Sequence, residues 1–216
     1  MARRSILIVL AAALALLVAV PGYAQDGGTQ RFVVSVDAVS DFSFHDSGAF
    51  NTPVAASGPG PLAPRGAYQW TFRAMPGDRL SFATMLVQSN DWFFAPAEPG
   101  IPLYQGGSKM TGDVTDYVLL WDAGTEGEGA PAEGPYQAPR QPGPNSGPAD
   151  PTGYVRQVLT DLTPPVEELV KVTLRDGGAN AFVLRIENIS GNSDFATPLA
   201  PGVGVVHVAP APLFIN

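Results

Sequence analysis

The chain has 216 residues, of which 45% are hydrophobic and 15% charged, so it suits a packed domain and excludes wholesale disorder. Its 24 glycines and 22 prolines disfavour a helical bundle and favour short strands joined by turns. A formal net charge of −8 lacks the basic footprint that a nucleic-acid-binding protein needs. The absence of cysteine excludes disulfides, thiolate metal sites and cysteine nucleophiles, and only His45 and His207 supply imidazoles.

The N-terminus has the pattern of an export signal. Two arginines precede an apolar run from Ile6 to Val20, and small residues stand at the −3 and −1 positions of a cleavage site after Ala24. The run is short for a membrane span of about 20 residues. The sequence therefore predicts a signal peptide over 1–24 and a single domain over 25–216. We expect the mature protein to be secreted or periplasmic, with no stable membrane insertion after cleavage.

Short β-branched or alternating segments separated by turn signals predict an all-β fold, in the form of an eight-stranded antiparallel β-sandwich. Residues 40–66 and 123–153 are rich in glycine and proline and are expected to be loops, whereas 154–162 is ambiguous between helix and strand. The strand candidates are 32–39, 68–73, 79–87, 113–121, 168–174, 181–189 and 203–208.

One pair of candidates suggests a hairpin. The strands 68–73 and 79–87 flank the turn residues Pro76-Gly77-Asp78. In the second strand, alternate residues from Leu80 to Leu86 are expected to face the core. The spacing predicts that the two strands pair directly with each other in antiparallel fashion.

Two polar and aromatic groups follow neighbouring strand candidates. Asp91 stands beside Trp92 after the strand that ends near residue 87, and Asp122 stands beside Trp121, with Glu126 following in the next turn. If these acids converge at one end of the sandwich, they supply the oxygen ligands that calcium requires. Extracellular modules fill weak oxygen-lined sites of this kind with calcium.

Other interpretations of these acids remain open. Each aspartate can be a turn residue that accepts hydrogen bonds from its own backbone. Paired carboxylates can also hydrolyse glycosides when they lie about 5–9.5 Å apart, so Asp91 and Asp122 form a candidate glycosidase pair with Trp92 and Trp121 as sugar platforms. A calcium-dependent carbohydrate-binding module is a further alternative. No recognised nucleophile, zinc or phosphate-loop motif supports catalysis, so the chain is expected not to be an enzyme.

The run from Pro76 to Phe93 resembles the central motif of the spondin N-terminal domain family, and 121–126 (WDAGTE) resembles that family's WDAGT segment. The segments 137–141 and 197–203 are similar to those of its bacterial members. The similarity extends over roughly residues 30–210. Cysteines of the animal members are absent here, so their disulfides do not carry over.

The resemblance implies a C2-like variant of the sandwich, a bound calcium ion, and a non-catalytic role in adhesion or extracellular interaction. It implies the metal ligands Asp91, Asp122 and Glu126, where Glu126 replaces the aspartate usual in animal members. We expect Asn90 or Glu126, with backbone carbonyls, to complete the shell. The partner is expected to be an extracellular protein or a glycan, and not nucleic acid.

Two further motifs have plainer interpretations. Asp113 and Asp116 stand three residues apart at a strand entry and are expected to form a turn and not to share an ion. The triplet Asn188-Ile189-Ser190 fits the pattern for N-glycosylation, but its position at a strand end favours an ordinary structural asparagine.

The export signal gives a first prediction. Protein purified from its native host should begin at Gln25 and lie outside the cytoplasm, because the pattern up to Ala24 is that of a cleaved leader. N-terminal sequencing measures this directly, and a retained Met1 would contradict it.

Overall fold

The computed structural model describes residues 44–127, 129–143, 146–159, 161–208 and 213–214. The expected leader over 1–24 and the expected strand over 32–39 lie outside the described residues. Within the described part, antiparallel strands predominate and helices are few and short, so the all-β class is confirmed.

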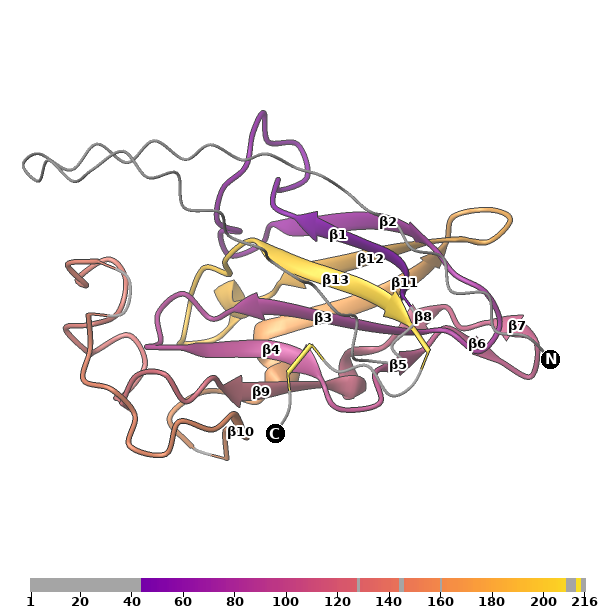
Figure 1. Cartoon of the computed structure of the whole chain (residues 1–216). Coiled ribbons are helices and arrows are strands. Elements are labelled where there is room, and N and C mark those ends of the chain that lie inside the picture. The colour runs from indigo at the N-terminus through magenta and orange to yellow at the C-terminus, as the bar shows by residue number, and fades with distance from the viewer. Residues whose placement is uncertain (1–43, 128, 144–145, 160, 209–212, 215–216) are drawn as a thin grey trace, which may run out of the picture. The chain divides into compact units, whose positions relative to one another are not determined.

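The larger sheet carries the candidate site at one end (Figure 1). Its strands run in the order β1-β13-β3-β4-β9-β10, and β5 pairs with β3 off this path. All of these pairings are antiparallel. The bounds are β1 (Phe44–Phe50), β13 (Gly202–His207), β3 (Arg79–Met85), β4 (Trp92–Pro96), β9 (Val118–Asp122), β10 (Arg156–Gln157) and β5 (Ile101–Pro102).

The second sheet runs in the order β2-β12-β11-β8, and β6 and β7 form a separate two-stranded ribbon. Its strands are β2 (Ala67–Arg73), β12 (Ala181–Asn188), β11 (Val170–Asp176) and β8 (Gly112–Asp113), and the ribbon consists of β6 (Tyr104–Gln105) and β7 (Ser108–Lys109). Three single-turn helices complete the described elements: η1 (Thr115–Tyr117), α1 (Val166–Leu169) and η2 (Ser190–Asn192).

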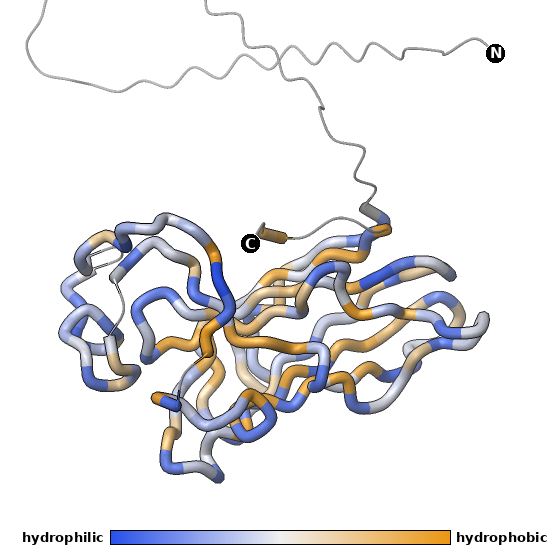
Figure 2. The backbone as a smooth tube through the Cα atoms, turned by 90° about the horizontal axis from the view of Figure 1, so that it is seen from below, coloured by the Kyte–Doolittle hydropathy of each residue, from blue (hydrophilic) through white to orange (hydrophobic). Residues whose placement is uncertain are grey.

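One hydrophobic core joins the two sheets. Every second residue of β12 is buried, as expected for a strand with one face against a core. Phe72 of β2 stacks on Phe182 of β12 with ring centroids 5.7 Å apart, and Phe50 of β1 meets both Tyr68 of β2 and Phe82 of β3. Figure 2 shows the hydrophobic colours concentrated along the strands and the hydrophilic ones in the connecting loops.

The expected hairpin between 68–73 and 79–87 is wrong. Both strands exist, but β2 pairs with β12, whereas β3 pairs with β13, β4 and β5. The turn at 76–78 therefore carries the chain from one sheet to the other. The expected inward face of β3 is confirmed, because Leu80, Phe82 and Leu86 are buried. Alternation determines which face of a strand is buried, but it does not determine the partner strand.

The expected loop over 40–66 contains a strand. β1 pairs with β13 over its whole length, although its sequence FHDSGAF is polar and short of β-branched residues. Among the described strands β1 lies at the edge of the larger sheet, where charged side chains are common.

The expected strand over 113–121 is divided into β8, the helical turn η1 and β9. The strands β8 and β9 belong to different sheets. The expected strand over 168–174 begins with the short helix α1. No strand candidate covers β4, whose first residue, Trp92, belongs to the polar and aromatic group that follows the strand candidate 79–87. The ambiguous segment 154–162 contains the short strand β10, and 123–153 is confirmed as a region without long elements.

A glycine pair sets the distance between the sheets at one place. Gly48 of β1 lies opposite Gly204 of β13, and the indole of Trp70 from β2 covers both positions. A Cβ atom on Gly204 would come within 2.3 Å of Cζ3 of Trp70. This indole is partly buried and packs against the hydrophobic core, so moving it away from Gly204 would disturb that packing.

We expect Gly204→Ala to lower the free energy of unfolding by about 1–3 kcal/mol, the usual cost of overpacking a core. Chemical denaturation provides the measurement. Gly58→Ala is the matched control, because a Cβ atom at Gly58 meets nothing within 4 Å. Equal effects of the two substitutions would show that the Trp70 contact does not limit the packing.

Candidate functional site

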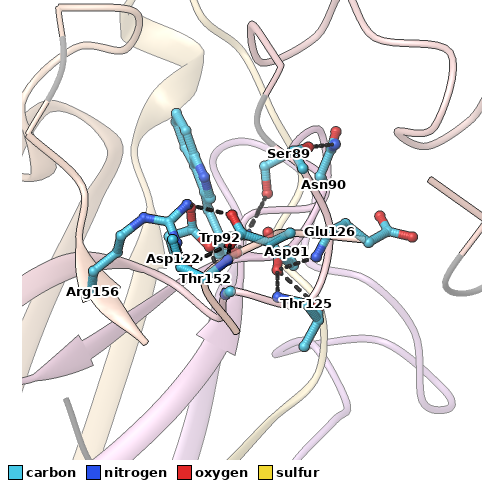
Figure 3. Close-up of polar contacts among 12 residues, drawn as sticks. Ser89, Asn90, Asp91, Trp92, Asp122, Thr125, Glu126, Thr152 and Arg156 are labelled. Carbon is cyan, nitrogen blue, oxygen red and sulfur yellow. Dashed lines mark hydrogen bonds and ion pairs between the residues drawn. The ribbon is translucent and has the colours of Figure 1, made fainter. Parts of the chain in front are cut away.

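The register of three strands places one aromatic and two charged side chains in a row. Trp92 of β4 lies opposite Asp122 of β9, and Asp122 lies opposite Arg156 of β10. Residues that are directly paired across strands present their side chains on the same face of the sheet. Figure 3 shows these side chains together at the end of the larger sheet.

Asp122 is a buried carboxylate with a cationic partner. Its side chain is 1% exposed, and its Oδ2 lies 2.6 Å from an Nη2 nitrogen of Arg156. Its Oδ1 accepts a hydrogen bond of 2.6 Å from the backbone N–H of Gly124. Both oxygens of Asp122 are therefore committed to protein donors.

Arg156 gathers a second acid into the same cluster. Its Nη2 lies 2.8 Å from Oδ2 of Asp150, and its Nη1 donates to the hydroxyl of Thr152. Arg156, and to a lesser extent Thr152, hold the pKa of Asp150 well below its usual range by donating hydrogen bonds to the ionised form. The guanidinium thus binds both ends of the loop that leaves β9 and returns as β10.

Asp91 does not share this arrangement. It lies in the bend just before β4, and its side chain has different partners from that of Asp122. Its Oδ2 accepts three hydrogen bonds, from the N–H and the hydroxyl of Thr125 and from the N–H of Glu126. Its Oδ1 is buried and has no hydrogen-bond partner among the residues that the structure describes.

Glu126 and Asn90 hold other parts of the long loop. Glu126 is 5% exposed, and its Oε1 accepts a hydrogen bond of 2.9 Å from the N–H of Gly147. The amide of Asn90 donates to the carbonyl of Gly127, and its Oδ1 accepts a hydrogen bond from the side chain of Gln137. All four predicted ligands therefore lie in one hydrogen-bonded region, each with its own partners.

Gln137 is a site residue that was expected only as part of a family-like segment. It is completely buried, and its Nε2 donates to Asn90 and to the carbonyl of Ala130, while its Oε1 accepts from the N–H of Gly134. A buried amide with this many partners fixes the surrounding loop. Its position in a polar, proline-rich run gave no signal of burial.

Gly124 is required by two features of its surroundings. Its φ is +68°, in the left-handed region that favours glycine, and a Cβ atom there would lie 2.3 Å from the carbonyl oxygen of Tyr154. The turn after Asp122 therefore packs directly against the returning segment before β10.

As a metal site, the region fits only in part. Among the described residues, no three acidic or histidine side chains converge on a common point. Asp122 is compensated by Arg156, whereas the unpartnered Oδ1 of Asp91 is an oxygen that a hard cation can use. Four carboxylates (Asp91, Asp122, Glu126 and Asp150) and one guanidinium give this region a negative balance.

Both tryptophans of the two motifs are buried, each with 3% of its surface exposed. Trp121 donates from Nε1 to the carbonyl of Ala95, and its ring packs against Phe214. Since neither indole is accessible, neither provides a platform on which a sugar ring could stack.

The two histidines have structural partners. Nε2 of His207 lies 2.8 Å from the Ser81 hydroxyl, and burial lowers the pKa of His207, which favours the neutral imidazole. His207 is completely buried and Ser81 nearly so, so this pair is closed to substrate. Nδ1 of His45 lies 2.6 Å from Oδ1 of the buried carboxylate of Asp78.

The two plainer motif interpretations agree with the structure. Oδ1 of Asp113 accepts from the N–H and hydroxyl of Thr115, which lowers the pKa of Asp113 and forms the expected turn. Asn188 is completely buried, and its amide donates to the carbonyls of Leu62 and Thr197. A glycosyltransferase cannot reach this asparagine in the folded chain.

Comparison of the chain with protein-family models, curated proteins and solved structures finds no match. The resemblance to the spondin N-terminal domain therefore stays a prediction. Within the described ranges, no helix is both long and apolar enough to cross a membrane.

The ion-pair cluster gives a stability prediction. We expect Arg156→Met to lower the free energy of unfolding by about 3 kcal/mol, because it leaves the buried charge of Asp122 without its cation. Urea denaturation provides the measurement. Adding Asp122→Asn to this variant should recover part of the loss, since the amide carries no charge.

The exposed Arg175 offers the matched control, and Arg175→Met should change stability by less than about 0.5 kcal/mol. If Arg156→Met proved no more costly than Arg175→Met, the pair with Asp122 would not hold the loop.

Proposed function

We propose that this chain is an exported, non-catalytic binding module, and that the loops after β3 and β9 form its functional end. The observation that carries the proposal is a loop of more than thirty residues, between β9 and β10, ordered by buried polar side chains. Long loops on a rigid sheet commonly carry binding sites. The antiparallel sheets and the single core support a C2-like sandwich of the type implied by the spondin resemblance.

We further propose that this end of the sheet binds calcium at Asp91. The support is the buried Oδ1 of Asp91, since a buried carboxylate oxygen without a partner is costly. Oxygens of Glu126 and Asn90 and nearby backbone carbonyls are the candidates to complete the shell. Bound there, the ion would neutralise charge and tie the turn before β4 to the loop after β9. Asp122 has its own cation in Arg156 and is assigned a supporting role.

Two observations favour binding over catalysis. Both oxygens of Asp122 are occupied by protein donors, and Oδ2 of Asp91 accepts three hydrogen bonds, so the proposed glycosidase pair is engaged in structural contacts. Trp92 and Trp121 are buried and offer no surface to a sugar. An extracellular protein is accordingly the favoured partner over a glycan.

Millimolar calcium should raise the melting temperature, and a chelator should lower it, because an ion that binds only the folded state stabilises it. The gain is about 2.7 kcal/mol at a hundredfold excess over Kd. Asp91→Asn should abolish the calcium-dependent shift, whereas Asp122→Asn should reduce overall stability and retain part of the shift. Differential scanning calorimetry with and without calcium measures both effects.

Asp113→Asn is the matched control, since Asp113 lies in a turn outside this region, and its shift should equal that of the wild type. Metal analysis of the purified protein detects an ion too tightly bound to remove. A calcium-dependent shift that survives Asp91→Asn, or a metal-free protein indifferent to calcium, would refute the site.

A further inference from the structure

The segment around β10 is an open sheet edge with exposed apolar side chains. β10 is the last strand of the larger sheet among the described residues, and it pairs only with β9. Tyr154 and Leu159, on either side of β10, are 77% and 85% exposed, and Leu162 is 57% exposed. Leu159 and Leu162 line one common cavity, and contiguous exposed apolar surface marks interaction sites.

Within the described part of the chain, the ladder leaves outer backbone groups of this edge unpaired. The N–H of Val158 donates to the carbonyl of Leu120, so Val158 and Leu120 form a hydrogen-bonded pair. Hydrogen-bonded and non-hydrogen-bonded pairs alternate in an antiparallel ladder. Gln157, paired with Trp121, therefore directs its N–H and C=O away from β9, towards solvent.

A cavity of about 500 Å³ lies beside this edge. Its walls include the indole of Trp92, the side chains of Val158, Leu159 and Leu162, and the Asp122–Arg156 ion pair. The lining therefore combines apolar side chains with a charged pair whose members already bind each other. Such a cavity can receive one large side chain of a strand that adds to β10.

The size of the apolar surface favours a peptide over a folded partner. The exposed parts of Tyr154, Leu159 and Leu162 amount to roughly 400 Å², given that a large aromatic side chain presents about 150–250 Å². A standard stable interface buries about 800 Å² on each partner. One added strand matches the smaller area and also supplies the missing backbone partners.

We propose that β10 is a docking edge for an extended peptide of another protein, with a large apolar side chain flanked by basic residues. The apolar side chain enters the cavity beside Trp92, and the peptide backbone pairs with Gln157. Basic flanks complement the formal charge of −8 and the acidic loop that ends at β10. The inference rests on the proposed binding-module function but not on the calcium site.

The experiment selects ligands from a displayed library of random peptides, about ten residues long, on the full mature protein, with calcium and with chelator. We expect enriched peptides with a large apolar residue between basic residues. Their binding should slow hydrogen exchange of the Gln157 amide. The proposal would be overturned by enrichment of acidic peptides or of peptides without a large apolar residue. No enrichment, with calcium or with chelator, would overturn it too.

Two variants test the edge itself. Gln157→Pro removes an N–H that points to solvent, so it should leave the fold intact and reduce peptide affinity at least tenfold, whereas Gln157→Ala keeps the N–H and the affinity. Leu159→Asp gives an independent test on a fully folded chain and should weaken binding similarly. Met75→Ser, an exposed apolar residue elsewhere, is the matched control and should have no effect.

Equal affinity of the wild type and both edge variants would refute the docking edge. So would self-association through this edge in sedimentation, or binding on a glycan array that Leu159→Asp abolishes. Peptide binding without a calcium-dependent melting shift would refute only the calcium site. A calcium-dependent shift without peptide binding would refute only the docking edge.

Discussion

The buried charge of Asp122 is the constraint on which the functional end of this protein depends. Asp122 ends β9 inside the protein, where an isolated carboxylate is unstable. Its cation, Arg156, stands 34 residues further along the chain, so the ion pair can form only if the intervening loop folds back onto the sheet. The requirement for a partner therefore determines where the loop returns and places β10 beside β9.

The loop between these two residues is ordered mainly by polar contacts, with few apolar side chains of its own. Gln137, Asn90 and Glu126 each bind backbone groups at separate places along it. Buried amides and carboxylates of this kind specify one conformation, because any other leaves their polar atoms without partners. A rigid loop of this length carries less entropy cost when it binds a partner than a flexible one would.

The sequence was sufficient to predict the class of fold and the faces of its clearest strands. Alternation predicts which side of β3 is buried, because a strand between a core and solvent has alternating side chains. The candidate over 181–189 corresponds to β12, in which every second residue is buried. Alternation did not identify partners, since the turn at 76–78 has the same residues whether it closes a hairpin or crosses between sheets. β4 could not be predicted from alternation, because four of its five residues are buried.

The candidate site was predictable to a similar extent. Asn90 and Asp91 stand just before β4, and Asp122 and Glu126 stand at or just after the end of β9. Because β4 and β9 pair in antiparallel fashion, the four residues lie at one end of the sheet. Their individual directions could not be predicted, because these depend on the register of β4 against β9. The roles of Arg156 and Gln137 could not be predicted. The partner of Arg156 stands 34 residues earlier in the sequence, and Gln137 lies in a polar segment that gives no indication of burial.

The contacts also divide these acids between different partners. Asp122 and Arg156 are cross-strand neighbours on one face of the sheet, whereas Asp91 lies outside the strands, in the bend just before β4. Hydrogen bonds from Thr125 and Glu126 stabilise one oxygen of Asp91 but add no positive charge. The single positive charge of the guanidinium is shared by Asp122 and Asp150, so it leaves none to compensate Asp91 and Glu126. A motif that keeps both aspartates can therefore depend on an ion at only one of them.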